Sequence, residues 1–122
     1  MKGNAMSKAM KVAIVDDEKD MRQSISQWLA LSGFDTEVFA SAEDALKGVG
    51  PDYPGIVVTD IRMPGMDGLT LMSRIREIDV DIPVILVTGH GDIQLAVRAM
   101  REGAYDFVEK PFDGAQLAEI AP

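Results

Sequence analysis

Five polar side chains in this sequence each stand at the end of a short apolar run, and together they could do one kind of chemistry. Asp16 and Asp17 follow the first run, Asp60 closes a second, and Thr88 and Lys110 follow two later ones. Carboxylates, a hydroxyl and an ammonium group are suited to binding magnesium and handling a phosphoryl group. Asp60 is the expected acceptor, because a carboxylate can act as a nucleophile and form an aspartyl phosphate.

The charges of these residues indicate a magnesium cofactor. Three converging carboxylates repel one another, and one of them would have a raised pKa unless a cation intervened. Mg²⁺ prefers oxygen ligands and keeps several waters when one or two carboxylates bind it. Lys110 adds a compact positive charge, and Thr88 adds a hydroxyl donor that could follow the phosphoryl group.

Five strands that alternate with helices are expected to position these residues. The strands are predicted at residues 12–15, 34–40, 55–60, 84–87 and 104–109. Continuous apolar runs are typical of parallel strands covered on both faces, whereas the alternating pattern of 34–40 indicates a strand nearer the sheet edge. The alternation predicts an α/β fold with a five-stranded parallel sheet in the flavodoxin-like order 2-1-3-4-5 and helices on both faces. This order brings Asp16, Asp17 and Asp60 to one crevice.

Helices are predicted at residues 20–32, from Ser41 to about 49, from Asp67, from Asp92 to Gly103, and from Asp113. Ser41, Asp67 and Asp92 are of the residue types that cap helix N-termini. Apolar stripes predict the inward faces. The stripes are Met21, Ile25, Trp28, Leu29 and Ser32 in the first helix, Leu69, Met72 and Ile75 or Ile78 in the third, and Ile93, Ala96, Val97 and Met100 in the fourth. Trp28 is interpreted as core filling, and the last helix is expected to be truncated by about two turns.

The motifs at the four strand ends resemble the receiver domain of two-component response regulators. They are residues 15–18, 60–68, 88–89 and 110–112, and the resemblance runs from Lys11 to the end of the chain. Residues 88–92 and 103–107 are particularly similar to the receivers of C4-dicarboxylate transport regulators, which activate the alternative sigma factor. We therefore predict a flexible leader at residues 1–10 and a receiver domain at residues 11–122.

The resemblance implies a metal site and a phosphoacceptor. Asp60 is expected to take phosphate from a sensor histidine kinase. Asp17 would bind Mg²⁺ directly and Asp16 through water. The backbone carbonyl of Arg62 would be a third protein ligand.

The resemblance also implies a switch. Thr88 and Lys110 would contact the phosphoryl group, and Phe107 matches the aromatic switch position. Many receivers carry Tyr there, and because Phe lacks a hydroxyl its switching must rest on ring packing alone. A cis peptide bond is expected between Lys110 and Pro111. His90 is interpreted as a loop residue that could tune phosphate lifetime, as could Arg62.

The composition restricts the classes of protein that remain. The chain has 122 residues, 47% hydrophobic and 26% charged, which suits one globular domain. A net charge of −8 argues against direct binding of nucleic acid. No segment is long and apolar enough for a membrane span or a secretory signal, so the cytoplasm is the expected location. There is no cysteine.

Three functions remain open to the sequence. The first is a phosphorylation-activated switch that catalyses only its own phosphorylation and dephosphorylation, and that controls a transcription-activating output domain of the same parent chain. The second is an aspartyl-phosphate phosphohydrolase, although such enzymes usually have an Asp-x-Asp motif and a cap domain. The third is a pseudo-receiver that serves as a dimerisation scaffold. A homodimer of this chain is also possible if it is a phosphorylation-activated switch.

Overall fold

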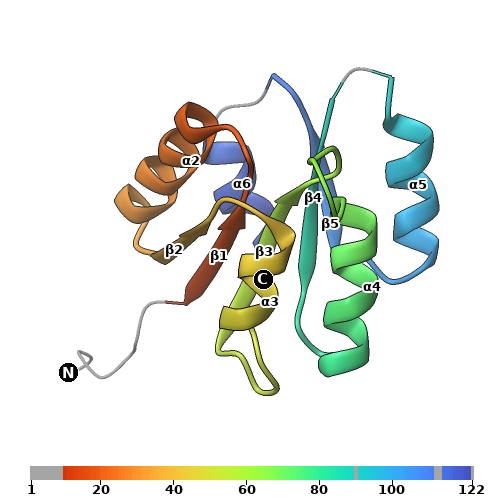
Figure 1. The fold of residues 1–122 in the computed structure, drawn as a ribbon. Coiled ribbons are helices and arrows are strands. Elements are labelled where there is room, and N and C mark those ends of the chain that lie inside the picture. The colour runs from red at the N-terminus through yellow and green to blue at the C-terminus, as the bar shows by residue number, and fades with distance from the viewer. Residues whose placement is uncertain (1–9, 90, 112–113, 122) are drawn as a thin grey trace.

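A single parallel sheet of five strands forms the centre of the protein, with helices on both of its faces (Figure 1). The structure is a computed structural model that describes residues 10–89, 91–111 and 114–121. The strands are β1 (Lys11–Val15), β2 (Asp35–Phe39), β3 (Gly55–Asp60), β4 (Val84–Thr88) and β5 (Asp106–Glu109). Their order in the sheet is β2-β1-β3-β4-β5, so the predicted order is confirmed.

The strand register brings the ends of β1, β3 and β4 to the same edge of the sheet. Val15 of β1 pairs with Thr59 of β3, and Asp60 pairs with Val87 of β4. Since all the strands run in one direction, the residues that follow them gather at this edge. The residues predicted to do chemistry are therefore neighbours in space.

Two helices cover one face of the sheet and three cover the other (Figure 1). The first pair is α2 (Lys19–Leu31) and α6 (Gly114–Ile120), and the second group is α3 (Ala42–Gly48), α4 (Gly68–Ile78) and α5 (Ile93–Arg101). In β1, Val12 and Ile14 pack with the α2 side, whereas Ala13 and Val15 pack with the α4 side. Both faces of this strand are buried, which explains its continuous apolar run.

Two of the predicted N-terminal caps form as expected. The side chain of Ser41 accepts a hydrogen bond from the Asp44 N–H (3.1 Å) at the start of α3. The side chain of Asp67 accepts one from the Thr70 N–H (2.8 Å) at the start of α4. Asp92 is the N-cap residue of α5, but its side chain makes no capping hydrogen bond among the described residues, so that prediction was wrong.

Four residues of the predicted inward stripes are exposed, and the structure corrects the prediction for Trp28, Ser32, Val97 and Met100. Trp28 is 51% exposed, because the buried face of α2 centres on Ile25 and Leu29. On α5, Val97 and Met100 are exposed (41% and 37%). Its inward residues are small, Ala96 and Ala99. Each residue turns a helix by about 100°, so Trp28, Val97 and Met100, each next in sequence to a buried residue, face away from the sheet.

The third-helix prediction is largely confirmed, because Met72 and Ile75 of α4 are buried together with Leu71, while Leu69 and Ile78 are half-buried. The predicted leader up to Ala9, the interpretation of His90 and the helix start at Asp113 lie outside the described residues. None of the described helices is long and apolar enough to cross a membrane.

Candidate functional site

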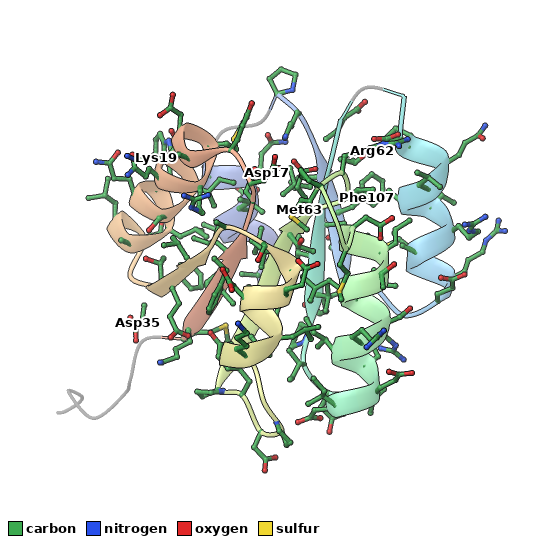
Figure 2. The ribbon with its side chains drawn as sticks, in the orientation of Figure 1. Asp17, Lys19, Asp35, Arg62, Met63 and Phe107 are labelled. Carbon is green, nitrogen blue, oxygen red and sulfur yellow. The ribbon has the colours of Figure 1, made fainter. Side chains whose placement is uncertain are left out.

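Three carboxylates converge at the carboxyl edge of β1 and β3. One oxygen each from Asp16, Asp17 and Asp60 lies within 4.8 Å of the other two. Asp16 and Asp60 are buried, with 2% and 8% of their surface exposed, and Asp17 is exposed. Figure 2 places Asp17 and Arg62 toward the same end of the sheet, whereas Asp35 lies toward the opposite end. The convergence that the strand order predicted is confirmed.

One buried oxygen of Asp16 has no hydrogen-bond partner in the part of the chain that the structure describes. Its Oδ1 accepts a hydrogen bond from the Glu18 N–H (2.9 Å), but Oδ2 finds no partner among the described residues. Burial raises the pKa of Asp16 above its usual value; the Glu18 N–H opposes this rise, and the negative charge of Asp60 adds to it. A buried carboxylate oxygen that meets no donor leaves room for a positive charge on that side.

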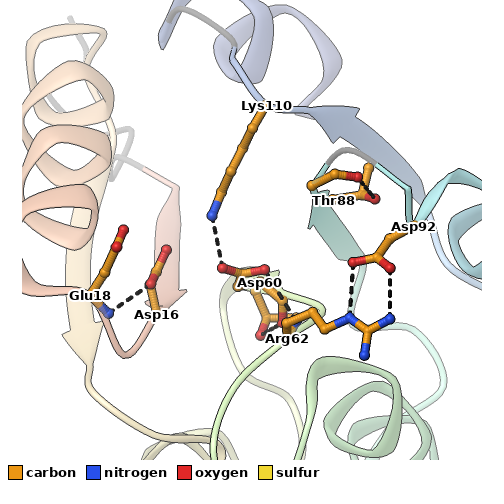
Figure 3. Close-up of polar contacts among 9 residues, drawn as sticks. Asp16, Glu18, Asp60, Arg62, Thr88, Asp92 and Lys110 are labelled. Atoms are coloured by element: carbon orange, nitrogen blue, oxygen red, sulfur yellow. Dashed lines mark hydrogen bonds and ion pairs between the residues drawn. The ribbon is translucent and has the colours of Figure 1, made fainter.

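Asp60 is held by two donors on its other side. Its Oδ2 pairs with Lys110 Nζ at 2.9 Å, and its Oδ1 accepts a hydrogen bond from the Arg62 N–H at 3.2 Å. Figure 3 shows the Lys110 side chain reaching down to the Asp60 carboxylate. Burial by itself would lower the pKa of Lys110, but the hydrogen bond and the charges of Asp60 and Asp16 raise it. Lys110 therefore carries its positive charge beside Asp60 at neutral pH.

Thr88 and Phe107 lie on β4 and β5, beside the acidic edge. Thr88 is fully buried, and its hydroxyl donates a hydrogen bond to the carbonyl of Gly89 (3.2 Å). Phe107 is half-buried, pairs in register with Leu86, and packs against the core cluster shared with α4 and α5. The Lys110–Pro111 peptide bond is cis, as predicted.

Arg62 makes a contact that the sequence did not reveal. Its Nε and Nη2 donate to the two carboxylate oxygens of Asp92, at 3.1 and 2.8 Å. The hydrogen bond from Arg62 holds the pKa of Asp92 below its usual value. The signal available in the sequence was position: Asp92 follows the end of β4 by four residues, so it lies at the same sheet edge as Arg62.

The backbone around the site is fixed by further contacts. The Arg22 guanidinium donates to the carbonyl of Asp16 at 2.7 Å, which holds the peptide that carries the buried carboxylate. The Gly68 N–H donates to the carbonyl of Ile61 at 2.8 Å and closes the loop after β3. A Cβ at Gly68 would overlap the carbonyl oxygen of Asp60, so this close approach requires glycine.

The donor set fits a divalent cation that prefers oxygen. These three carboxylates are suited to Mg²⁺, which takes carboxylate and carbonyl ligands together with water, and one of their buried oxygens has no partner within the described residues. Asp16, Asp17 and Asp60 are the residues that would hold it. The backbone carbonyl of Arg62 remains a predicted ligand.

This combination of fold and site defines a class of signalling domain. Residues 12–121 match the protein family described as the response regulator receiver domain, and the chain therefore belongs to this family of two-component systems.

Two curated relatives are transcriptional regulators. The chain is 53% identical over 116 residues to the C4-dicarboxylate transport transcriptional regulatory protein DctD of Rhizobium meliloti (strain 1021). The aligned region covers 95% of this chain and 25% of DctD. It is 44% identical over 109 residues to the transcriptional regulatory protein FixJ of the same organism, covering 88% of this chain and 53% of FixJ. The chain thus spans a quarter to about half of the length of these relatives.

Solved structures agree with the fold. A response regulator receiver domain protein from Clostridium thermocellum matches with a TM-score of 0.87 and 30% identity, covering 91% of this chain and 90% of that one. The crystal structure of FixJ-N matches with a TM-score of 0.83 and 42% identity, covering 93% and 91%.

Proposed function

We propose that this receiver accepts a phosphoryl group on Asp60 from a sensor histidine kinase, with Mg²⁺ as cofactor. The observation that carries the proposal is the setting of the Asp60 carboxylate. It lies beside Asp16 and Asp17, which follow β1, and is held by the Lys110 ammonium (2.9 Å) and the Arg62 N–H (3.2 Å). Bound Mg²⁺ would supply the positive charge that Asp16, Asp17 and Asp60 lack, and would offset charge on the phosphoryl oxygens.

The bonds that form and break in the transfer belong to the chain and the kinase, and Mg²⁺ would only offset charge. A carboxylate oxygen of Asp60 attacks phosphorus, and the P–N bond of the kinase phosphohistidine breaks, so that its electron pair stays on the imidazole nitrogen. Lys110 holds the carboxylate in place and neutralises part of the charge that develops on the phosphoryl oxygens. In this reaction the chain catalyses only its own phosphorylation and, with water, its own dephosphorylation.

The phosphoryl group is proposed to act as a signal through Thr88 and Phe107. The Thr88 hydroxyl, which now donates to the Gly89 carbonyl, would turn to the phosphoryl oxygens. Phe107 is half-buried against the core, so it could repack into space that Thr88 leaves. The face of α5, β5 and α6 would then change its affinity for partners.

The relatives suggest where the signal goes. Both DctD and FixJ are transcriptional regulators longer than this chain. We propose that residues 11–122 form a receiver most similar to those of C4-dicarboxylate transport regulators, that it controls a transcription-activating output domain in a longer parent chain, and that it works in the cytoplasm. Phosphorylation could act through a homodimer of receivers.

The test is phosphorylation by a small donor. The protein is incubated with Mg²⁺ and acetyl phosphate, and intact mass is measured. We expect one added phosphoryl group in the native chain and in D67N, which changes another aspartate of the same loop, and none in D60N or in the presence of EDTA. Absence of the group from the native chain, or its persistence in D60N, would refute the proposal. Steady multiple turnover of organic phosphates would instead favour a phosphohydrolase.

A further inference from the structure

Asp92 is the N-cap residue of α5, but across residues 10–89, 91–111 and 114–121 its side chain makes no capping hydrogen bond. At the starts of α3 and α4, Ser41 and Asp67 have extended backbones (ψ 159° and 174°), and their side chains accept a hydrogen bond from the third helical N–H. Asp92 differs in both respects, because its ψ is 11° and both its oxygens bind the Arg62 guanidinium. The ion pair with Arg62 therefore takes the place of a cap on α5.

This helix is held to the core by little apolar surface. The buried side chains of α5 are Ala96 and Ala99, with Ile93 and Leu95 half-buried, whereas α4 buries the larger Leu71, Met72 and Ile75. Burial of apolar surface stabilises packing roughly in proportion to its area. The contact with Arg62 is therefore one of the few side-chain contacts that fix the start of α5.

The chain before α5 contains two glycines. Gly91 has φ +96°, and a Cβ at Gly89 would meet no atom within 4 Å. Such residues absorb a change in backbone angles at small cost. Gly89 and Gly91 are thus suited to a change in the position of the helix start.

Arg62 is placed to serve a second anion. Its backbone N–H donates to Asp60 Oδ1, so its side chain begins beside the phosphoacceptor, and from there it extends to Asp92 (Figure 3). The Arg62 side chain is 71% exposed, whereas that of Asp92 is 11% exposed. An exposed guanidinium can change partner with little loss of packing. A phosphoryl group brings roughly two negative charges, and arginine binds such groups well.

We propose that Arg62 and Asp92 form a latch that holds the start of α5 to the loop after β3, and that a phosphoryl group on Asp60 opens this latch by competing for the Arg62 guanidinium. This inference rests on the phosphorylation of Asp60 proposed above. Once released, Asp92 rotates to an extended backbone and caps α5 at the Leu95 N–H, the third amide of the helix. The start of α5 moves with it, and the exposed Val97 and Met100 of this helix shift relative to the sheet.

Hydrogen exchange of the Leu95 amide tests the latch without any phosphodonor. Arg62→Met frees Asp92, and Asp92→Asn keeps a capping oxygen but removes the charge that attracts Arg62. In both variants the Leu95 amide should exchange roughly fivefold more slowly than in the native chain. A change of this size corresponds to the stability that one side-chain cap contributes. Asp92→Ala breaks the latch and offers no cap, so it should give no protection. The Thr70 amide, already capped by Asp67, is the internal reference.

Beryllofluoride, a mimic of the phosphoryl group, tests the competition. With Mg²⁺ and beryllofluoride, the native chain should gain the same protection at Leu95. D92N should bind beryllofluoride roughly fivefold more tightly, because it no longer competes for Arg62. The control is D44N, the same change at the remote exposed pair of Asp44 and Lys47, which should leave both measurements unchanged.

The outcomes separate this inference from the proposed function. Unchanged Leu95 exchange in both D92N and R62M overturns the latch, even if intact mass shows phosphate on Asp60. Protection in the variants but none in the native chain with bound beryllofluoride overturns the competition. If intact mass shows no phosphate on Asp60 at all, the proposed function fails, and with it the coupling of the latch to phosphorylation.

Discussion

Replacing Asp16 by Asn should stabilise this protein when magnesium is absent. Asp16 is buried, its Oδ2 has no hydrogen-bond partner among the described residues, and it lies beside Asp60. Asn keeps an oxygen to accept from the Glu18 N–H, removes a buried negative charge, and places an amide donor where the unpartnered oxygen was. Functional sites often hold such unfavourable charges.

The size of the effect follows from the unpartnered atom. A buried acceptor without a partner costs about 1–3 kcal/mol. D16N should therefore raise the free energy of unfolding in EDTA by about 1–3 kcal/mol, which for a domain of this length corresponds to a rise in Tm of about 3–6 °C per kcal/mol.

Magnesium should narrow the difference in the free energy of unfolding between the two proteins. Binding to the native fold alone stabilises it by about 1.4 kcal/mol when Mg²⁺ is at ten times its Kd. The native chain should gain this stability, and D16N should gain less of it. Urea unfolding of both proteins, with EDTA and with a Mg²⁺ series, measures the difference. D44N is the control, because it makes the same change at an exposed residue outside the cluster.

The pH dependence has a definite sign. Burial raises the pKa of Asp16 in the folded protein above its unfolded value of 3.8. The folded state then binds the proton more tightly, so stability from this group is present below pH 3.8 and is lost as pH rises through the raised pKa. The extra stability of D16N over the native chain should thus be largest above that raised pKa and should vanish in acid. A D16N protein less stable than the native chain in EDTA at neutral pH would refute the reasoning.

Three further substitutions have expected outcomes. Lys110→Met should lower the free energy of unfolding by about 1–2 kcal/mol, since it leaves the charge of Asp60 without its partner. Urea unfolding measures this change. In the mass assay, the same substitution should slow phosphate uptake. Gly68→Ala should destabilise by about 1–3 kcal/mol because its Cβ overlaps the Asp60 carbonyl; an unchanged Tm would contradict this. Ser41→Ala should lower the free energy of unfolding by about 1 kcal/mol, because it removes the cap at the Asp44 N–H. Urea unfolding measures this change, and phosphate uptake in the mass assay should stay the same.

The order of elements could be predicted because each was encoded locally. Apolar runs marked the strands, and Ser41 and Asp67 marked helix starts that form as expected. The acids at the strand ends were then brought together by the strand order alone, since parallel strands end at one edge. The side-chain roles inferred from the family resemblance stay predictions.

The sequence predicted less well which face of each helix is buried and which is exposed. Val97 and Met100 fit an apolar stripe, yet α5 lies on the sheet through Ala96 and Ala99. Periodicity identifies a helix, but how closely it approaches the sheet decides which residues are buried. Trp28 is exposed for the same kind of reason, because α2 packs through Ile25 and Leu29.

The sequence by itself determined the fold class, the strand order and the group of acids at one sheet edge, because these depend on local patterns and on the direction of the strands. Only the tertiary structure decided which partners those groups have. Arg62 and Asp92 are 30 positions apart and meet because β3 and β4 are neighbours. The same packing leaves Asp16 Oδ2 buried without a donor among the described residues. Hydrogen bonds and burial depend on distances that no local pattern contains.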